Sequence, residues 1–113
     1  MHNQTVVVEI LLVTECPNAD VARSNVDAAL ALLEPKIPGG TIAVHTTMVR
    51  NHEEAQERDF VGSPTFLIDG VDPFGAANQQ PGLSCRIYQY EGKITAVPTP
   101  AMLADAIAAR LAQ

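Results

Sequence analysis

The sequence contains no tryptophan, and aromatic residues make up only 4% of its 113 residues. Any core must therefore be built from aliphatic side chains, and a hydrophobic fraction of 47% is sufficient for one. The chain is too short for two domains of ordinary size. We expect residues 1–113 to form a single domain.

Basic residues are few, with seven lysines and arginines against thirteen acidic residues and a net charge of −6. No basic patch is visible, which argues against nucleic acid or an anionic membrane surface as a partner. The longest apolar stretch, residues 6–13, is interrupted by Glu9 and falls far short of the roughly 20 residues that a membrane-spanning helix needs. Residues 1–4 lack the basic character of a secretory signal.

Cysteine is also scarce, since Cys16 and Cys85 are the two in the chain and lie far apart. Such usage does not resemble the disulfide framework of small secreted domains. It predicts two thiols in a reducing, cytoplasmic compartment. His45 and His52 have no clustered histidine or cysteine near them, so we expect no metal site, and no motif indicates another cofactor.

The first half of the chain has the pattern of a parallel β-α-β unit. Residues 5–14 are almost continuously apolar and rich in valine and isoleucine, which is typical of a central strand. Residues 41–50 alternate as a second strand. Between them one helical stripe is apolar, and it comprises Ala22, Val26, Ala29, Leu30 and Leu33. A crossover of this length predicts a right-handed connection.

The second half adds a short helix, two strands and a last helix. The helix over residues 52–60 is capped by Asn51, and strands are expected at 65–69 and 85–90. Thr99 and Pro100 are a suitable start for the final helix. The order β-α-β-α-β-β-α predicts an α/β fold, with a four-stranded mixed sheet flanked by helices. Residues 71–84 lack periodicity, and loops of that length are often functional.

Cys16 is the first candidate for chemistry, because it lies where the first strand gives way to the first helix. Unpaired N–H groups and the positive end of the helix dipole at such a point stabilise a thiolate. Asp20, four residues later, could donate a proton there. The alternatives are an inert, buried cysteine and an acid that only favours the dipole.

A second feature is the segment Ser63-Pro64-Thr65, which falls between the second helix and the third strand. In this element order it resembles the cis-proline loop of the thioredoxin superfamily, with Cys16-Pro17 at the position of the reactive cysteine. The resemblance spans nearly the whole chain and implies a thioredoxin-like fold in which Pro64 packs against Cys16. It also implies that Pro17, Ser63 and Thr65 contact the partner, a small thiol or a protein disulfide.

The sequence departs from that superfamily at three points. Ala19 stands where dithiol members carry their second cysteine, so a Cys-x-x-Cys disulfide cannot form. Ile10 stands where they carry a buried carboxylate, and Glu9 faces the other side of the strand. No clear glutathione-binding pattern is present. These departures favour monothiol chemistry at Cys16.

More narrowly, the runs Cys-Pro-Asn, Gly-Ser-Pro-Thr, Asp-Gly-x-Asp-Pro-Phe and Ser-Cys-Arg-x-Tyr resemble small bacterial thioredoxin-like proteins, some labelled alkylmercury lyase. That label implies mercury binding by Cys16 and Cys85, with Asp20 as the acid. If residues 85–90 pair antiparallel with 65–69, Cys85 lies far from Cys16. A loop 71–84 that folds back would instead bring the two cysteines together.

Three functions therefore remain. The first is thiol–disulfide exchange or thiol capture through Cys16, and it is the hypothesis we favour. The second is organomercurial chemistry using both cysteines. The third is a non-catalytic binding module, which the loss of the second cysteine at Ala19 supports. The sequence does not identify a substrate or an oligomeric state.

Overall fold

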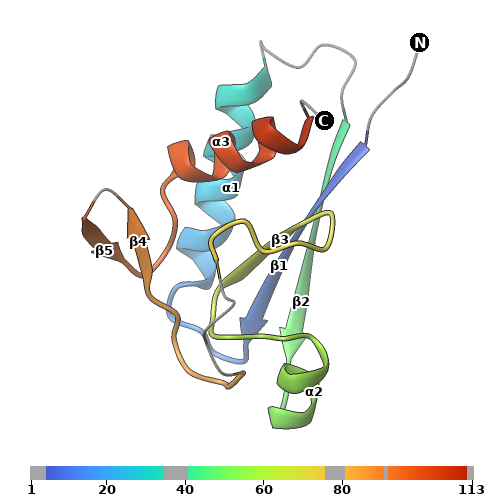
Figure 1. Cartoon of the computed structure of the whole chain (residues 1–113), viewed down its shortest axis with the longest axis vertical. Coiled ribbons are helices and arrows are strands. Elements are labelled where there is room, and N and C mark those ends of the chain that lie inside the picture. Colours follow the sequence, from blue (N-terminus) through green and yellow to red (C-terminus); the bar gives the residue numbers. More distant parts are fainter. Residues whose placement is uncertain (1–4, 35–40, 76–80, 91, 112–113) are drawn as a thin grey trace.

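The computed structural model describes residues 5–34, 41–75, 81–90 and 92–111. Its elements in chain order are β1 (Thr5–Val13), α1 (Ala19–Leu33), β2 (Thr41–Val49), α2 (His52–Glu57), β3 (Thr65–Ile68), β4 (Tyr88–Tyr90), β5 (Lys93–Thr95) and α3 (Pro100–Leu111) (Figure 1). The order differs from the expected one by a single additional strand, β5. The prediction of an α/β fold is confirmed.

The main sheet has three strands in the order β2-β1-β3. β1 and β2 are parallel, with Thr5 opposite Thr41 and Val13 opposite Val49. β3 runs antiparallel on the other side of β1, where Leu11 faces Thr65. β1 is therefore the central strand, and helix α1 forms the predicted crossover to β2.

The core lies on one face of this sheet, because alternate side chains of β1 point to opposite faces. α1 and α3 cover that face (Figure 1). The β1 residues buried against them are Val6, Val8, Ile10 and Leu12. From α1 the core receives Ala22, Val26, Ala29 and Leu33, with Leu30 partly buried, which confirms the predicted helical stripe.

The opposite face holds a smaller cluster, formed by Leu11, Val49, Ala55 and Phe60. Glu9 also lies on this face, where its carboxylate accepts hydrogen bonds from Thr47 and Arg58 at 2.6 and 2.5 Å. Ile10 is fully buried and belongs to the hydrophobic core.

Two predicted helix starts are confirmed in detail. The Asn51 side chain accepts a hydrogen bond from the Glu54 N–H at 2.8 Å and caps α2. The Thr99 hydroxyl accepts from the Met102 N–H at 3.2 Å, and Pro100 is the first residue of α3. Among the described residues no helix has both the length and the apolar character needed to cross a bilayer.

The expected fourth strand of the sheet is a correction. Within the described ranges, residues 88–90 pair with β5 in a separate hairpin, and the main sheet keeps three strands. The outer edge of β3 is engaged by other groups. Val71 turns back to exchange hydrogen bonds with Ile68, and the Tyr88 hydroxyl donates to the Pro64 carbonyl. The Tyr88 side chain thus occupies the Pro64 carbonyl, a backbone acceptor that a fourth paired strand would use.

Candidate functional site

Cys16 lies in a tight turn that joins β1 to α1. Its N–H donates to the Val13 carbonyl at 3.3 Å, and its carbonyl accepts from the Ala19 N–H at 3.2 Å. Glu15, with φ of 62°, supplies the left-handed backbone that this turn requires. Pro17 is exposed and precedes the helix.

The N-terminus of α1 faces this turn. Asn18 is the N-cap residue, but its side chain makes no capping hydrogen bond. The first-turn N–H groups therefore lack that partner, and the helix dipole adds positive potential at the same end. Asp20 lies in this first turn with a fully exposed side chain, 3.9 Å from Nη1 of Arg23. This placement is that of a surface acid.

Ser63 and Pro64 lie against the end of β1. The Ser63–Pro64 peptide bond is cis, as the sequence analysis expected. Both residues are buried. The Ser63 hydroxyl accepts a hydrogen bond from the Val13 N–H at 3.1 Å. The residue before the proline is thus attached to the strand end from which the Cys16 turn departs.

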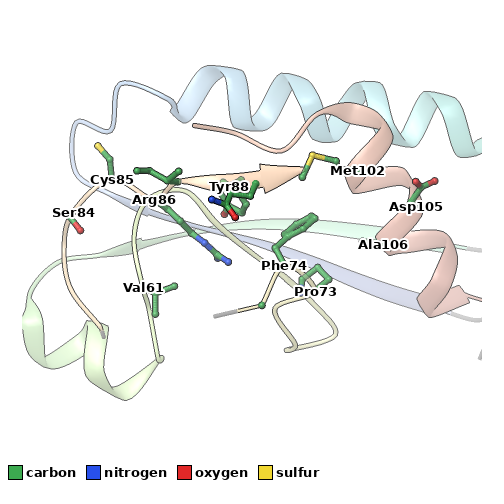
Figure 2. A pocket seen from close by; sticks show the side chains of 13 residues that line it. Val61, Pro73, Phe74, Ser84, Cys85, Arg86, Tyr88, Met102, Asp105 and Ala106 are labelled. Carbon is green, nitrogen blue, oxygen red and sulfur yellow. The ribbon is translucent and has the colours of Figure 1, made fainter. Parts of the chain in front are cut away.

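Cys85 lies directly beside Ser63. The two residues form a parallel bridge, in which the Ser63 N–H donates to the Ser84 carbonyl at 2.8 Å and the Arg86 N–H donates to the Ser63 carbonyl at 3.0 Å. Residues 81–87 consequently run past the same end of the sheet as residues 14–18 (Figures 1 and 2). The alternative in which Cys85 lies at the opposite edge is wrong, because the chain folds back before β4.

The two cysteines differ in exposure. Cys16 is half-buried and contacts the main core, whereas Cys85 is exposed, and both are free thiols. Figure 2 shows Cys85 at one end of a neighbouring groove, which it helps to line. Hydrogen bonds thus join Ser63 to the end of β1 on one side and to the segment that carries Cys85 on the other.

Two of the three residues expected to bind a partner, Ser63 and Thr65, are already engaged within the chain. Both backbone groups of Ser63 pair with residues 84 and 86. The Thr65 hydroxyl donates to the Gly62 carbonyl at 2.5 Å and accepts from Arg86 Nη1 at 3.5 Å. A partner could pair with Ser63 only after residues 84–86 had moved away.

Arg86 anchors this segment. Its buried guanidinium donates from Nη1 to Asp72 Oδ2 at 2.6 Å and from Nη2 to Oδ1 at 3.4 Å. The guanidinium carbon lies 4.4 Å from the centre of the Tyr88 ring. Burial raises the pKa of Tyr88 above its ordinary value. In the sequence, the available signals for this contact were Arg86 two residues before Tyr88, and Asp72 shortly after the preceding strand.

A groove extends from Cys85 along β4 toward α3 (Figure 2). Phe74, Tyr88 and Met102 contribute apolar surface, and Arg86 and Asp105 contribute charge. The rings of Phe66, Phe74 and Tyr88 contact one another edge to face. Cys16 and Pro64 do not line this groove. Part of the loop that the sequence analysis singled out, residues 76–80, lies outside the described residues.

Over the described part of the chain, no group of three or more histidine, cysteine or acidic side chains could hold a metal ion. Comparisons with family models, with curated proteins and with solved structures found no match. The chemistry of this site is therefore argued from its own residues.

Proposed function

We propose that this chain is a monothiol thioredoxin-like protein, in which Cys16 exchanges with the disulfide of a small thiol or a protein. One observation carries the proposal. Cys16 occupies the turn between β1 and an α1 N-terminus without a side-chain cap, and the Ser63-Pro64 segment is fastened to the strand end beside it. The strand order β2-β1-β3 and the helices α1 and α3 on one face are compatible with a thioredoxin-like fold.

The thiol–disulfide exchange needs no cofactor, because every S–S bond that breaks is replaced by a new one. The Cys16 thiolate attacks one sulfur of a disulfide R–S–S–R′, a new S–S bond forms, and R′S⁻ leaves with the electron pair of the broken bond. An external thiolate then attacks the sulfur of R, which restores Cys16 and releases R in a new disulfide. A reducing, cytoplasmic compartment suits this cycle, because it keeps the thiol available.

The position of Cys16 beside the N-terminus of α1 is the reason that we expect it to react faster than an ordinary thiol. Asp20 lies in the first turn of α1 with an exposed side chain. Pro17 is the partner-binding candidate that remains accessible beside Cys16. Ser63 and Thr65 instead hold residues 84–86 in place.

Two single-cysteine variants provide a matched test. Cys85→Ser leaves Cys16 as the reactive thiol, and Cys16→Ser leaves Cys85. Each is treated with oxidised glutathione at pH 7, and adduct formation is followed by intact-protein mass spectrometry. We expect Cys16 to form the adduct about tenfold faster than Cys85, although Cys85 is more exposed.

The contrary result is equally clear. If Cys16 forms no adduct, or reacts more slowly than Cys85, accessibility governs reactivity and thiol exchange at Cys16 is wrong. The chain is then better described as a non-catalytic module. Far-ultraviolet circular dichroism of both variants controls for loss of the fold.

Organomercurial cleavage is a second candidate, and the position of Cys85 beside Ser63 favours it. Two thiolates from the segments on either side of Ser63 could bind one mercury ion. The proposed acid, Asp20, has an exposed side chain near Arg23 and would have to turn toward the thiols. Incubation with phenylmercury tests the candidate. Release of benzene supports it, whereas stoichiometric binding without benzene eliminates the lyase activity.

A further inference from the structure

We propose that Cys85 is the resolving thiol for Cys16, and that the two form a reversible disulfide across the Ser63-Pro64 segment. This inference rests on the proposed function, because it assigns the second step of the same exchange to a residue of the chain. Ala19 removes the usual second cysteine from α1. The structure offers another from a distant part of the sequence.

The position of Cys85 is fixed by backbone pairing. Ser84 and Arg86, the residues on either side of it, each share a hydrogen bond with Ser63. Ser63 in turn accepts from Val13, and the Cys16 N–H donates to the Val13 carbonyl. A short chain of hydrogen bonds therefore links the two cysteine-bearing segments.

Close packing keeps the Cys85 segment in this place. Gly62 approaches the backbone of Arg86 so closely that a β-carbon at position 62 would lie 2.8 Å from the Arg86 Cβ. The Arg86 guanidinium is held from the other side by Asp72. Cys85 is thus presented by a segment anchored at its backbone and at the following side chain, while its own side chain stays exposed.

The second step follows from this arrangement. After Cys16 has formed a mixed disulfide with R, the Cys85 thiolate attacks the Cys16 sulfur. The Cys16–Cys85 bond forms, and RS⁻ leaves with the electron pair of the broken bond. Over both steps one disulfide is reduced to two thiols and the protein dithiol is oxidised. An external dithiol of the cell returns it to the reduced form.

An internal thiol has a large kinetic advantage. A thiol held near its target acts at an effective concentration of roughly millimolar or more, well above that of an external thiol at micromolar concentration. The mixed disulfide at Cys16 should therefore be short-lived in the native chain. It should accumulate when Cys85 is replaced.

The experiment compares the native chain with Cys85→Ser after treatment with oxidised glutathione and acid quenching. We expect the native chain to lose two hydrogens by mass and to yield a peptide linking Cys16 with Cys85. In Cys85→Ser we expect a stable glutathione adduct at Cys16, about tenfold more abundant than in the native chain. Ser84→Cys combined with Cys85→Ser is the matched control, because neighbouring residues of an extended segment point to opposite sides. This control should keep the adduct.

The outcomes separate the two proposals. Equal accumulation of the Cys16 adduct in the native chain and in Cys85→Ser overturns the resolving role and leaves exchange at Cys16 intact. An internal disulfide in the native chain without any adduct in Cys85→Ser overturns the order of attack and the proposed function with it. Absence of both products overturns both proposals.

Discussion

The two ends of the β1–β3 pair are held by different kinds of contact. At the amino end of β1, the Asp69 carboxylate accepts from the Val7 N–H at 2.8 Å and from Arg110 Nε at 2.7 Å. The Asp69 N–H donates to the Val7 carbonyl at 2.8 Å. At the carboxyl end β1 contacts Ser63 through backbone groups and the neutral Ser63 hydroxyl, the buried Arg86–Asp72 ion pair anchors the neighbouring segment, and two thiols lie nearby.

The difference is between polar groups that hold the fold together and thiols that are free to react. The carboxylate of Asp69 is matched by partners on two elements, so it fastens α3 and β1 to the end of β3. At the other end, the groups that could react are not used to hold the chain together. The segment that carries Cys85 is held by its neighbours instead, through Ser84 and Arg86.

The largest expected effect is the loss of the Arg86 anchor. Arg86→Met leaves the Asp72 carboxylate, which is mostly buried, without its charged partner. Removing one member of a buried pair is strongly destabilising, and we expect a loss of about 4 kcal/mol in the free energy of unfolding. Urea unfolding measures it. Arg110→Met removes the more exposed cation at the opposite end and should cost about 1 kcal/mol or less.

If the two variants lose equal stability, the contrast between the ends is wrong. The double variant Arg86→Met with Asp72→Asn sharpens the test, because it removes the unpaired charge. It should recover part of the lost stability. Failure to recover any would indicate that the aliphatic packing of Arg86, not its charge, holds the segment.

A smaller effect is expected from glycine, since each end carries one with a positive φ. Gly62, with φ of 138°, lies against Arg86, whereas a β-carbon added to Gly70, with φ of 83°, would meet no atom within 4 Å. Gly70→Ala incurs backbone strain alone, about 1 kcal/mol. Gly62→Ala adds a steric clash and should cost about 3 kcal/mol. Urea unfolding of the two variants measures the difference.

The same pair of variants tests the placement of Cys85. Gly62→Ala must push residues 84–86 away from Ser63, so the internal disulfide should form more slowly than in the native chain. Gly70→Ala should leave that rate unchanged. Rates are compared by quenched mass spectrometry at pH 7 without denaturant. Equal rates in both variants would mean that the Gly62–Arg86 contact does not position Cys85.

Much of the fold was predictable because it follows from local patterns. The apolar stripe of α1, the Asn51 and Thr99 caps and the parallel β1–β2 unit all depend on residues close in sequence. The position of Cys85 was not predictable in that way. Alternation over residues 85–90 indicated a strand, and no local signal specified that Ser63 would pair with Cys85 while β4 paired with β5.

The candidate site was predictable to a similar extent. Cys16 at the strand–helix junction and the turn at Pro64 were visible as short motifs. The Arg86–Asp72 pair was missed, because it joins the expected strand over residues 85–90 to a loop without regular periodicity. The pair holds the buried Arg86 side chain against the loop that contains Asp72. Contacts of that kind arise only when the chain is assembled.

The smallest effect concerns the amino end of β1 and depends on pH. The Arg110 guanidinium and the Val7 N–H hold the pKa of Asp69 below its ordinary value of 3.8. The unfolded chain then binds this proton more readily than the folded chain, so the contribution is fully present above pH 3.8 and is lost as pH falls through the folded-state pKa. We expect a contribution of about 1 kcal/mol, since the pair is partly exposed.

Asp69→Asn isolates this contribution, because asparagine tolerates the positive φ of 50° at this position and keeps an acceptor for Val7. The variant should be about 1 kcal/mol less stable than the native chain at pH 7, and the difference should shrink as pH falls below 3.8. Urea unfolding across this pH range measures it. A stability difference that stays constant with pH would show that hydrogen-bond geometry alone holds the amino end of β1. The claim that the charge of Asp69 stabilises this end would then be wrong. The disulfide yield of Cys16 and Cys85 in the same variant should remain native, because Asp69 lies at the far end of β1.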